Sequence, residues 1–291
     1  MGIMRELGYY HEKLMPEFLY PRALKNWYKK CTGKELDLKD PKTFNEKLQW
    51  IKLYYRDPKM SLLSDKYLVR DYIREKIGEE YLIPLVGAYD SFDEIDFDKL
   101  PDSFIMKANH GSKWNIIVRD KANFDKEDAR RKFNKWLKKD FSWYFGYQLH
   151  YGRIKPKIVI EELLKDERHD LYDYKIMVLD GKARFIWVDS DRETCHHRNI
   201  FDFDWNPAPF TWEFPKKETE PERPVNLAKM KELAETLSEG FNEVRVDFYE
   251  VQGKIYFGEL TFTHGSGQEK FDPPEWDRKV GDMFTLPDPV K

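Results

Sequence analysis

The sequence of 291 residues contains only two cysteines, Cys31 and Cys195, and no long apolar run. Two cysteines are too few for a disulfide framework, and without a CxxC pair no zinc site is indicated. Because no run of about 18 apolar residues occurs, no membrane-spanning helix is expected. The first residues, MGIMRELGYYHEK, contain no apolar stretch typical of a secretory signal. The sequence therefore predicts a soluble, cytoplasmic protein.

The chain also lacks an excess of charge of either sign. Its 50 Lys and Arg residues and 53 Asp and Glu residues give a formal net charge of −3. A general nucleic-acid binder needs a clear basic excess, so no nucleic-acid partner is expected. The hydrophobic fraction of 41% is sufficient for a packed core in one large domain or in two closely packed lobes.

Two kinds of pattern divide the chain. The first hundred residues favour helices: Thr43 and Glu46 form a capping-box pattern, and Ser64 is a possible N-cap for a helix that ends at Gly78. After residue 103 the patterns predict helices around 129–137 and 227–237, and short strands at 104–107, 115–118, 157–162, 173–179, 183–188, 244–249 and 255–261. Asp180-Gly181 is a strong hairpin signal. The sequence therefore predicts an α+β fold built from antiparallel sheets.

The stretch VRVDFYEVQGKIYFGELTF predicts a hairpin with two possible registers. A two-residue turn at Gln252-Gly253 would place Asp247 opposite Gly258 and mix the polar and apolar faces. A three-residue loop that also includes Lys254 aligns one apolar face and places Asp247 opposite Glu259. Because burial of an apolar face specifies the register strongly, we expect the second arrangement.

Two carboxylates that face each other destabilise a hairpin unless a cation lies between them. Oxygen ligands from carboxylates and phosphates are those that Mg²⁺ prefers. The alternatives are that Asp247 and Glu259 turn into solvent or pair with Arg245.

Other charged residues lie near strand ends. Lys107 precedes a turn of small and polar residues whose N–H groups suit phosphate, although ordinary hairpins contain such turns too. Lys175 interrupts an apolar strand, either as a second cation for a ligand or as an edge-strand residue with its stem along the surface. Glu161 and Glu162 end the strand IVIEELL, where they either receive ribose hydroxyls or are solvated.

In this order, these residues resemble the ATP-grasp superfamily, and more specifically the TupA-like (teichuronopeptide-biosynthesis type) ATP-grasp proteins of bacterial surface-polysaccharide genes. The stretches that carry the resemblance include KTFNEKLQW, SDKYLVRDYI, FIMKANHGS, VRVDFYEVQGKIYFGELTFT and GSGQEKFDPPEWD. The resemblance implies two lobes whose antiparallel sheets clasp ATP. It divides the chain into a helical N-terminal region (1–100), a small lobe (101–160) and a large lobe with the metal site (161–291).

The resemblance also implies ATP and Mg²⁺ as cofactors. The residues expected at the nucleotide are Lys107, His110, Gly111, Ser112, Glu161, Glu162, Leu164, Lys175 and Arg245. The expected metal ligands are Asp247, Glu259 and Thr261, where Thr261 replaces the asparagine that the superfamily usually carries.

The implied activity is an ATP-dependent carboxylate–amine ligase that forms an amide through an acylphosphate. Its substrates would be a uronic-acid sugar and an amino acid or other amine, in capsule, O-antigen or teichuronopeptide biosynthesis, with polysaccharide assembly enzymes as partners. The residues expected in catalysis are Lys107, Arg245, His264 and Ser266, and those expected at the substrate are Arg192, Arg198, Gly265 and Gly267. His110 is a second candidate for proton transfer.

Other functions remain open at this point. A glycosyltransferase would use Asp189-Ser190-Asp191 to chelate a metal, although no doubly wound nucleotide-binding pattern surrounds that triplet. A kinase that stops at phosphoryl transfer, and a nucleotide-binding protein without turnover, are further alternatives.

Overall fold

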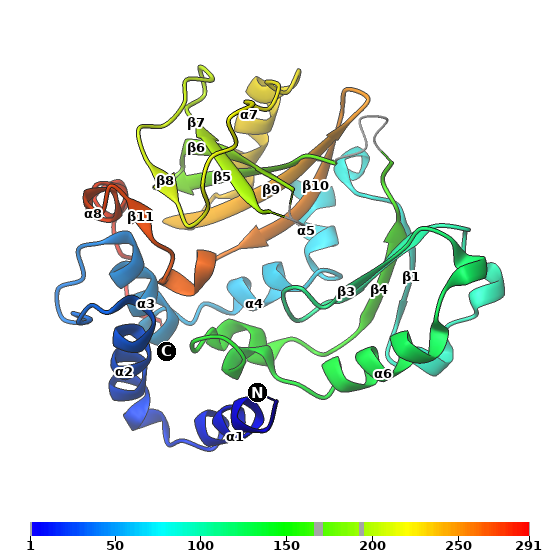
Figure 1. Ribbon diagram of the computed structural model, residues 1–291, viewed down its shortest axis with the longest axis horizontal. Coiled ribbons are helices and arrows are strands. Elements are labelled where there is room, and N and C mark those ends of the chain that lie inside the picture. The colour runs from blue at the N-terminus through cyan, green and yellow to red at the C-terminus, as the bar shows by residue number, and fades with distance from the viewer. Residues whose placement is uncertain (1, 166–170, 192–194, 291) are drawn as a thin grey trace.

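The computed structural model describes residues 2–165, 171–191 and 195–290 (Figure 1). Its α-helices are α1 (Gly2–Lys13), α2 (Tyr20–Thr32), α3 (Phe44–Tyr54), α4 (Pro58–Ser64), α5 (Val69–Lys76), α6 (Lys126–Trp136), α7 (Leu227–Leu237) and α8 (Glu275–Gly281). Two short 3₁₀ helices also matter for the site, η7 (Leu149–Arg153) and η8 (His264–Gly267). Within the described residues, no helix combines the length and the apolar character needed to cross a membrane.

The strands form two main antiparallel sheets. The four-stranded sheet has the order β1-β4-β2-β3, with β1 (Leu85–Tyr89), β2 (Phe104–Ala108), β3 (Asn115–Val118) and β4 (Ile158–Glu162). The five-stranded sheet has the order β10-β9-β5-β6-β7, with β5 (Asp173–Leu179), β6 (Lys182–Ser190), β7 (His197–Phe201), β9 (Glu243–Val251) and β10 (Lys254–Thr261). A small sheet pairs β8 (Thr211–Trp212) with β11 (Phe271–Asp272). The predicted α+β architecture with antiparallel sheets is confirmed.

The N-terminal region contains the predicted helices and, in addition, one strand. The predicted capping box starts α3: the Thr43 side chain accepts from the Glu46 N–H, and the Glu46 carboxylate accepts from the Thr43 N–H. Ser64 was predicted wrongly as an N-cap, because it is the last residue of α4 and α5 begins at Val69. One strand, β1, also lies within the first hundred residues, where its pairing with the distant β4 overrides a weak local pattern.

Each sheet buries one face against helices (Figure 1). In the four-stranded sheet, Phe104 and Met106 of β2 share a core with Ala129 and Phe133 of α6. In the five-stranded sheet, α7 packs over β5, β6 and β9. Figure 1 shows α4 and α5 in the region between the two sheets.

Helix α3 belongs to the core of the five-stranded sheet. Its Phe44, Leu48 and Ile51 are buried there, and the ring of Phe44 contacts Trp212 edge-on at a centroid distance of 5.0 Å. The helical region is therefore packed onto the large lobe.

The β9–β10 hairpin differs from the expected one at its tip. Val251 pairs with Lys254, so the turn consists of only Gln252 and Gly253, with φ of 52° and 75°. The predicted three-residue loop is therefore wrong. However, the register shifts between Phe257 and Glu259, because Gly258 is an extra residue in β10. This β-bulge restores the predicted pairing of Asp247 with Glu259.

Candidate active site

The two facing carboxylates are joined by one arginine of the same sheet. Arg245 and Asp247 lie two residues apart on β9, so their side chains point to the same face. Arg245 Nε lies 2.6 Å from Asp247 Oδ1, and Nη2 lies 2.7 Å from Asp247 Oδ2. The same Nη2 lies 2.7 Å from Glu259 Oε1. A single guanidinium nitrogen therefore bridges the two carboxylates and offsets their repulsion.

Lys175 approaches Asp247 from the neighbouring strand. In the register of β5 and β9, Lys175 lies opposite Asp247, and its Nζ lies 2.9 Å from Asp247 Oδ2. Lys175 also forms an ion pair with Asp173. Because β5 is the central strand of its sheet, the edge-strand alternative for Lys175 is wrong. Burial raises the pKa of Asp247, but Arg245 and Lys175 outweigh burial and hold that pKa below its ordinary value.

Glu161 of the four-stranded sheet is bound by two cations. Lys107 Nζ lies 2.6 Å from Glu161 Oε2, and Arg70 Nη1 of α5 lies 2.9 Å from Oε1. The carboxylate expected at ribose hydroxyls is thus already engaged, because tertiary folding brings Arg70 onto the end of β4. Glu162 is exposed and Leu164 is half-buried where the chain leaves β4.

Lys66 was not among the predicted site residues. Its Nζ donates to the Gly111 carbonyl at 2.7 Å and lies 4.0 Å from Glu259 Oε2. This one side chain therefore connects the turn after β2 with the acidic pair on the five-stranded sheet. Burial lowers the pKa of Lys66, while Glu259 opposes that shift. The available signal was the stretch SDKYLVRDYI, which contains both Lys66 and Arg70.

The turn after β2 is packed against the interior of its lobe. The ring nitrogens of His110 lie 3.2 Å from Asn109 Oδ1 and 3.2 Å from the Trp136 carbonyl, and burial lowers its pKa. A Cβ on Gly111 would lie 2.6 Å from the ring of Trp114. The side chain of His110 is thus engaged in the core, contrary to the role expected for it in proton transfer. Ser112 is exposed on this turn.

His264 holds the other side of Arg245. Its Nδ1 lies 2.8 Å from Arg245 Nη1. Arginine can only donate, so Nδ1 accepts and the ring hydrogen is on Nε2, which faces Glu269 Oε2 at 2.9 Å. Burial lowers the pKa of His264. Burial raises the pKa of Glu269, but His264 and Arg198 outweigh it and lower that pKa to about 2. His264 therefore acts as a neutral positioning residue for Arg245.

The loop after β10 packs on the N-terminal helices. Ser266 Oγ accepts from Lys52 Nζ at 2.7 Å and donates to the Phe145 carbonyl at 3.0 Å. Its hydroxyl, expected to hold an acyl group, is therefore engaged within the protein. Gly265 and Gly267 have φ of 55° and 63°, and a Cβ on Gly267 would lie 2.5 Å from Gln49 Nε2. These contacts give Gly267 a packing role in place of the substrate contact expected for it.

Arg198, expected to receive a substrate anion, is paired with acids of the protein itself. It is buried, with Nε 2.8 Å from Asp189 Oδ1 and Nη1 3.1 Å from Glu269 Oε2. The pairing also engages Asp189, the first acid of the triplet that a glycosyltransferase would use. Asp191 of that triplet pairs instead with Lys217 at 2.8 Å. Arg192, the other expected anion receptor, lies outside the described residues.

Asp247, Glu259 and Thr261 provide the kind of donors that a hard cation takes. All three offer oxygens, and Thr261 Oγ1 lies 3.4 Å from Glu259 Oε1. In the part of the chain that the structure describes, no cluster of three or more His, Cys, Asp or Glu side chains is arranged to hold a metal. The two carboxylates therefore fit Mg²⁺ as a partial ligand set that phosphate oxygens would complete.

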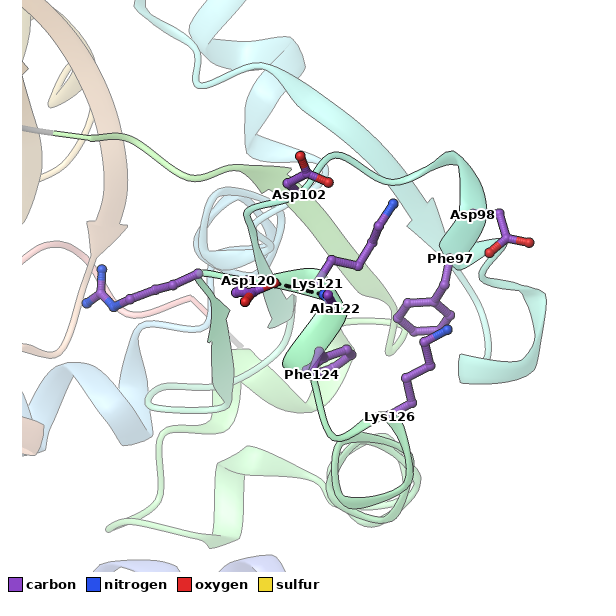
Figure 2. Close-up of a pocket in the computed structure, with 9 residues that line it drawn as sticks. Phe97, Asp98, Asp102, Asp120, Lys121, Ala122, Phe124 and Lys126 are labelled. Carbon is purple, nitrogen blue, oxygen red and sulfur yellow. Dashed lines mark hydrogen bonds between the residues drawn. The ribbon is translucent and has the colours of Figure 1, made fainter.

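An open pocket of about 620 Å³ lies elsewhere, on the four-stranded lobe (Figure 2). Its charged lining contains three acidic and three basic residues: Asp98, Asp102, Asp120, Arg119, Lys121 and Lys126. Figure 2 shows Phe97 beside Lys126, whose Nζ lies 4.9 Å from the ring centroid. None of the predicted site residues lines this pocket, so it is not the candidate active site.

Comparison with known families identifies the family of the chain. The model of the TupA-like ATP-grasp family matches residues 46–285. The chain belongs to the TupA-like ATP-grasp family. This membership confirms both the predicted family and the predicted ATP-grasp fold.

Several solved structures are similar to the chain at low identity. One is the D-alanine–D-alanine ligase of Bacillus anthracis complexed with ATP (16% identity, 70% of this chain, 55% of that chain, TM-score 0.41). Another is the ATP-grasp ligase PsnB with minimal precursor, Mg and ADP (13% identity, 74% of this chain, 56% of that chain, TM-score 0.40). A third is the N5-carboxyaminoimidazole synthetase of Staphylococcus aureus with ADP (14% identity, 69% of this chain, 44% of that chain, TM-score 0.39). The chain thus spans about half the length of these proteins. No curated protein matches the chain.

Proposed function

We propose that this protein is an ATP-dependent carboxylate–amine ligase. Membership of the TupA-like ATP-grasp family supports the reaction class. The observation that carries the proposal is the bridge formed by Arg245 Nη2, which lies 2.7 Å from both Asp247 Oδ2 and Glu259 Oε1. Such a cluster brings together two carboxylates, which suit a divalent metal, and a guanidinium, which suits phosphate oxygens.

The proposed reaction has two steps. An oxygen of the substrate carboxylate attacks the γ-phosphorus of ATP, an acyl–phosphate bond forms, and the bond to the ADP oxygen breaks. The nitrogen of an amine then attacks the acyl carbon, an amide bond forms, the bond from the acyl carbon to the phosphate oxygen breaks, and the leaving phosphate takes up the proton that the amine loses. Mg²⁺, when held by Asp247 and Glu259, neutralises charge on the phosphates.

The protein contributes position and positive charge to these steps. Lys66, Lys107 and Arg245 stand on three different segments and supply cations for the phosphates. The neutral ring of His264 accepts from Arg245 and keeps its guanidinium aimed at the acidic pair. Because these groups are already in place, little reorganisation is needed when negative charge develops on the transferring phosphoryl group.

The finer proposal concerns the substrates. The acid is a uronic-acid sugar, nucleotide- or lipid-linked, and the amine is an amino acid or another amine, in bacterial surface-polysaccharide biosynthesis. We place this reaction in the cytoplasm, in association with polysaccharide assembly enzymes. The resemblance to teichuronopeptide-biosynthesis proteins supports this choice.

The test incubates the purified protein with ATP, Mg²⁺, a panel of uronic-acid donors and a panel of amines. We expect amine-dependent release of ADP and phosphate, together with an amide product detected by mass spectrometry. Release of a nucleoside diphosphate from a sugar donor, with ATP unchanged, would overturn the proposal in favour of a glycosyltransferase.

A further inference from the structure

A second, smaller cavity lies beside the loop that follows β10. It has a volume of about 180 Å³ and is lined by side chains of α3, of the segment after it and of η7, and by Glu17, Tyr20 and Trp143. Lys52, Arg56, His150 and Arg153 are among its lining residues. Sites for drug-sized ligands measure roughly 300–1,000 Å³, so this cavity suits one small molecule.

Lys52 is a buried cation whose hydrogen-bond partners are all neutral. It is 3% exposed, and its Nζ donates to Gln49 Oε1 at 2.9 Å, to the Ser266 carbonyl at 2.5 Å and to Ser266 Oγ at 2.7 Å. Its Nζ also lies 4.9 Å from the centroid of the Trp27 ring. Among the described residues, no Asp or Glu forms an ion pair with it, and burial lowers its pKa well below the ordinary value. Burial without an anion disfavours the ammonium form of Lys52, so a negative charge in the cavity would stabilise that form.

His150 adds an unpaired polar atom to the same cavity. The residue is 9% exposed, and its Nε2 has no hydrogen-bond partner among the described residues. Burial, with a smaller contribution from the charge of Lys52, lowers the pKa of His150 to about 3. The ring is therefore neutral at ordinary pH and leaves one nitrogen available for a ligand.

The remaining charges leave the cavity positive. Arg56 Nη1 pairs with Glu17 at 2.7 Å, so these two charges compensate each other. Asp57 accepts from the Lys59 N–H and from the Tyr55 hydroxyl. Within the described residues, the exposed Arg153 donates to the Arg56 carbonyl alone, at 3.3 Å. Lys52 and Arg153 outnumber the remaining lining acid, Asp57, so the cavity has an excess of one positive charge when Lys52 is protonated.

We propose that this cavity binds a small carboxylic acid, the size of an amino acid or a single sugar acid. Its carboxylate would bond to His150 Nε2 and to Arg153 at the rim. Lys52 would act on it through its charge alone, because its three N–H groups already donate to Gln49 and Ser266. The acid would supply the negative charge that Lys52 lacks and a partner for His150 Nε2. The cavity is too small for a sugar nucleotide or a polymer segment.

The position of the cavity connects it to the candidate active site. Ser266, which contacts Lys52, lies on the loop that directly follows β10 and its Glu259. His150 of η7 lines the cavity. The next residue, Tyr151, is within the influence of Glu259, because burial and the charge of Glu259 both raise the pKa of Tyr151. The cavity is thus connected to the acidic pair through the loop after β10. The binding of the acid does not depend on the proposed ligase function. Only the role of that acid as the substrate to be activated rests on it.

The test measures binding to the full chain without nucleotide, by calorimetry and by tryptophan fluorescence. Two ligand pairs separate the carboxylate from the rest of the molecule: D-glucuronate with D-glucose, and L-alanine with L-alaninol. We expect at least one acid to bind at least tenfold more tightly than its partner. Failure of both acids to bind, or equal affinity within both pairs, would overturn the proposal.

Variants locate the bound acid. Lys52→Gln is expected to weaken acid binding at least tenfold, and Arg153→Gln several-fold. Lys47→Gln is the matched control, because Lys47 is also on α3 but donates to the Gly281 and Phe284 carbonyls. If Lys52→Gln does not fold, the exposed variant Arg153→Gln and the two ligand pairs measured on the wild-type protein still test whether the acid binds in this cavity. Unchanged affinity in Arg153→Gln and in any folded Lys52→Gln would contradict the proposed site.

The same variants separate the two proposals. If the acid binds but ADP never forms with any amine, the ligase function fails and the cavity assignment stands. If ADP forms normally and the KM for the acid is unchanged in Arg153→Gln and Lys52→Gln, the ligase function stands and the cavity assignment fails.

Discussion

Asp247 and Glu259 lie directly opposite each other on β9 and β10 because Gly258 is bulged out immediately before Glu259. The two-residue turn at the tip would otherwise pair Asp247 with Gly258. A side chain is disfavoured at the bulge, since a Cβ on Gly258 would lie 3.1 Å from the Asp247 carbonyl. The bulge therefore brings both carboxylates to the same nitrogen of Arg245.

Removing the charge of Glu259 should separate activity from stability. The Glu259 side chain is 38% exposed, so Glu259→Gln should change the free energy of unfolding by at most about 1 kcal/mol. It should lower the kcat for ADP release about 100-fold, because a charge partner of Arg245 and of the metal is lost. Steady-state kinetics and urea unfolding measure the two effects. The control is Glu232→Gln, which breaks the exposed pair with Lys229. Activity within about twofold of wild type would contradict the assignment of Glu259.

Lys66 should contribute to nucleotide binding although it lies outside both sheets. Lys66→Met removes the cation that lies 4.0 Å from Glu259 Oε2 and contacts the Gly111 carbonyl. A charged hydrogen bond is worth about 1.5–3 kcal/mol, so the Kd for ATP should rise about ten- to a hundredfold. Calorimetric titration with ATP and Mg²⁺ measures this, with the exposed Lys59→Met as the control. An unchanged Kd would show that Lys66 only links the lobes.

Two glycine substitutions should separate backbone strain from packing. Gly267 and Gly253 both have positive φ, 63° and 75°. A Cβ on Gly267 would lie 2.5 Å from Gln49 Nε2 and 2.9 Å from Leu48 Cβ, whereas Gly253 has nothing within 4 Å. Gly267→Ala should therefore destabilise by about 1–3 kcal/mol more than Gly253→Ala in urea unfolding. If the two variants lose the same free energy of unfolding, α3 can move away from the loop without destabilising the protein.

His150 should make the fold sensitive to acid. Its pKa is about 3 in the folded protein, because of burial and then the charge of Lys52, and about 6.5 in an unfolded chain. The unfolded state thus binds one more proton between these values, so stability is complete above about pH 6.5 and falls as the pH decreases. The one extra proton bound by the unfolded state lowers the free energy of unfolding by about 2 kcal/mol between pH 6.5 and pH 5.

The comparison that isolates this contribution uses His150→Phe. Urea unfolding at pH 7 and pH 5 should show a smaller loss of stability in His150→Phe than in wild type. His11→Gln alters an exposed histidine and should keep the wild-type difference between the two pH values. If His150→Phe loses as much stability as wild type, the acid sensitivity has another origin.

Local signals in the sequence predicted the elements that local chemistry specifies. Thr43 and Glu46 form the expected capping box, and Asp180-Gly181 forms the expected turn, with φ of 48° and 70°. The Asp247–Glu259 pairing was predicted correctly from the apolar face of the hairpin. The predicted loop was wrong because a glycine bulge preserves the same apolar face with a different turn.

Contacts between distant segments could not be predicted in this way. Arg70 reaches Glu161 across 91 residues, and Lys52 reaches Ser266 across 214 residues. Neither contact has a local pattern, since each depends on how the N-terminal helices pack against the sheets. The contacts of His110 with the Trp136 carbonyl and of Arg198 with Glu269 were missed for the same reason.

The sequence by itself determined the alternation of buried and polar positions, and with it the antiparallel strands, the two facing acids and the family. These follow from short-range periodicity and from the order of charged residues along the chain. Only the tertiary structure decided which cations neutralise those acids, that Lys66 joins the site, and that Lys52 and His150 line a cavity beside it. The physical reason is that charge compensation and burial depend on distances between segments that are remote in the chain.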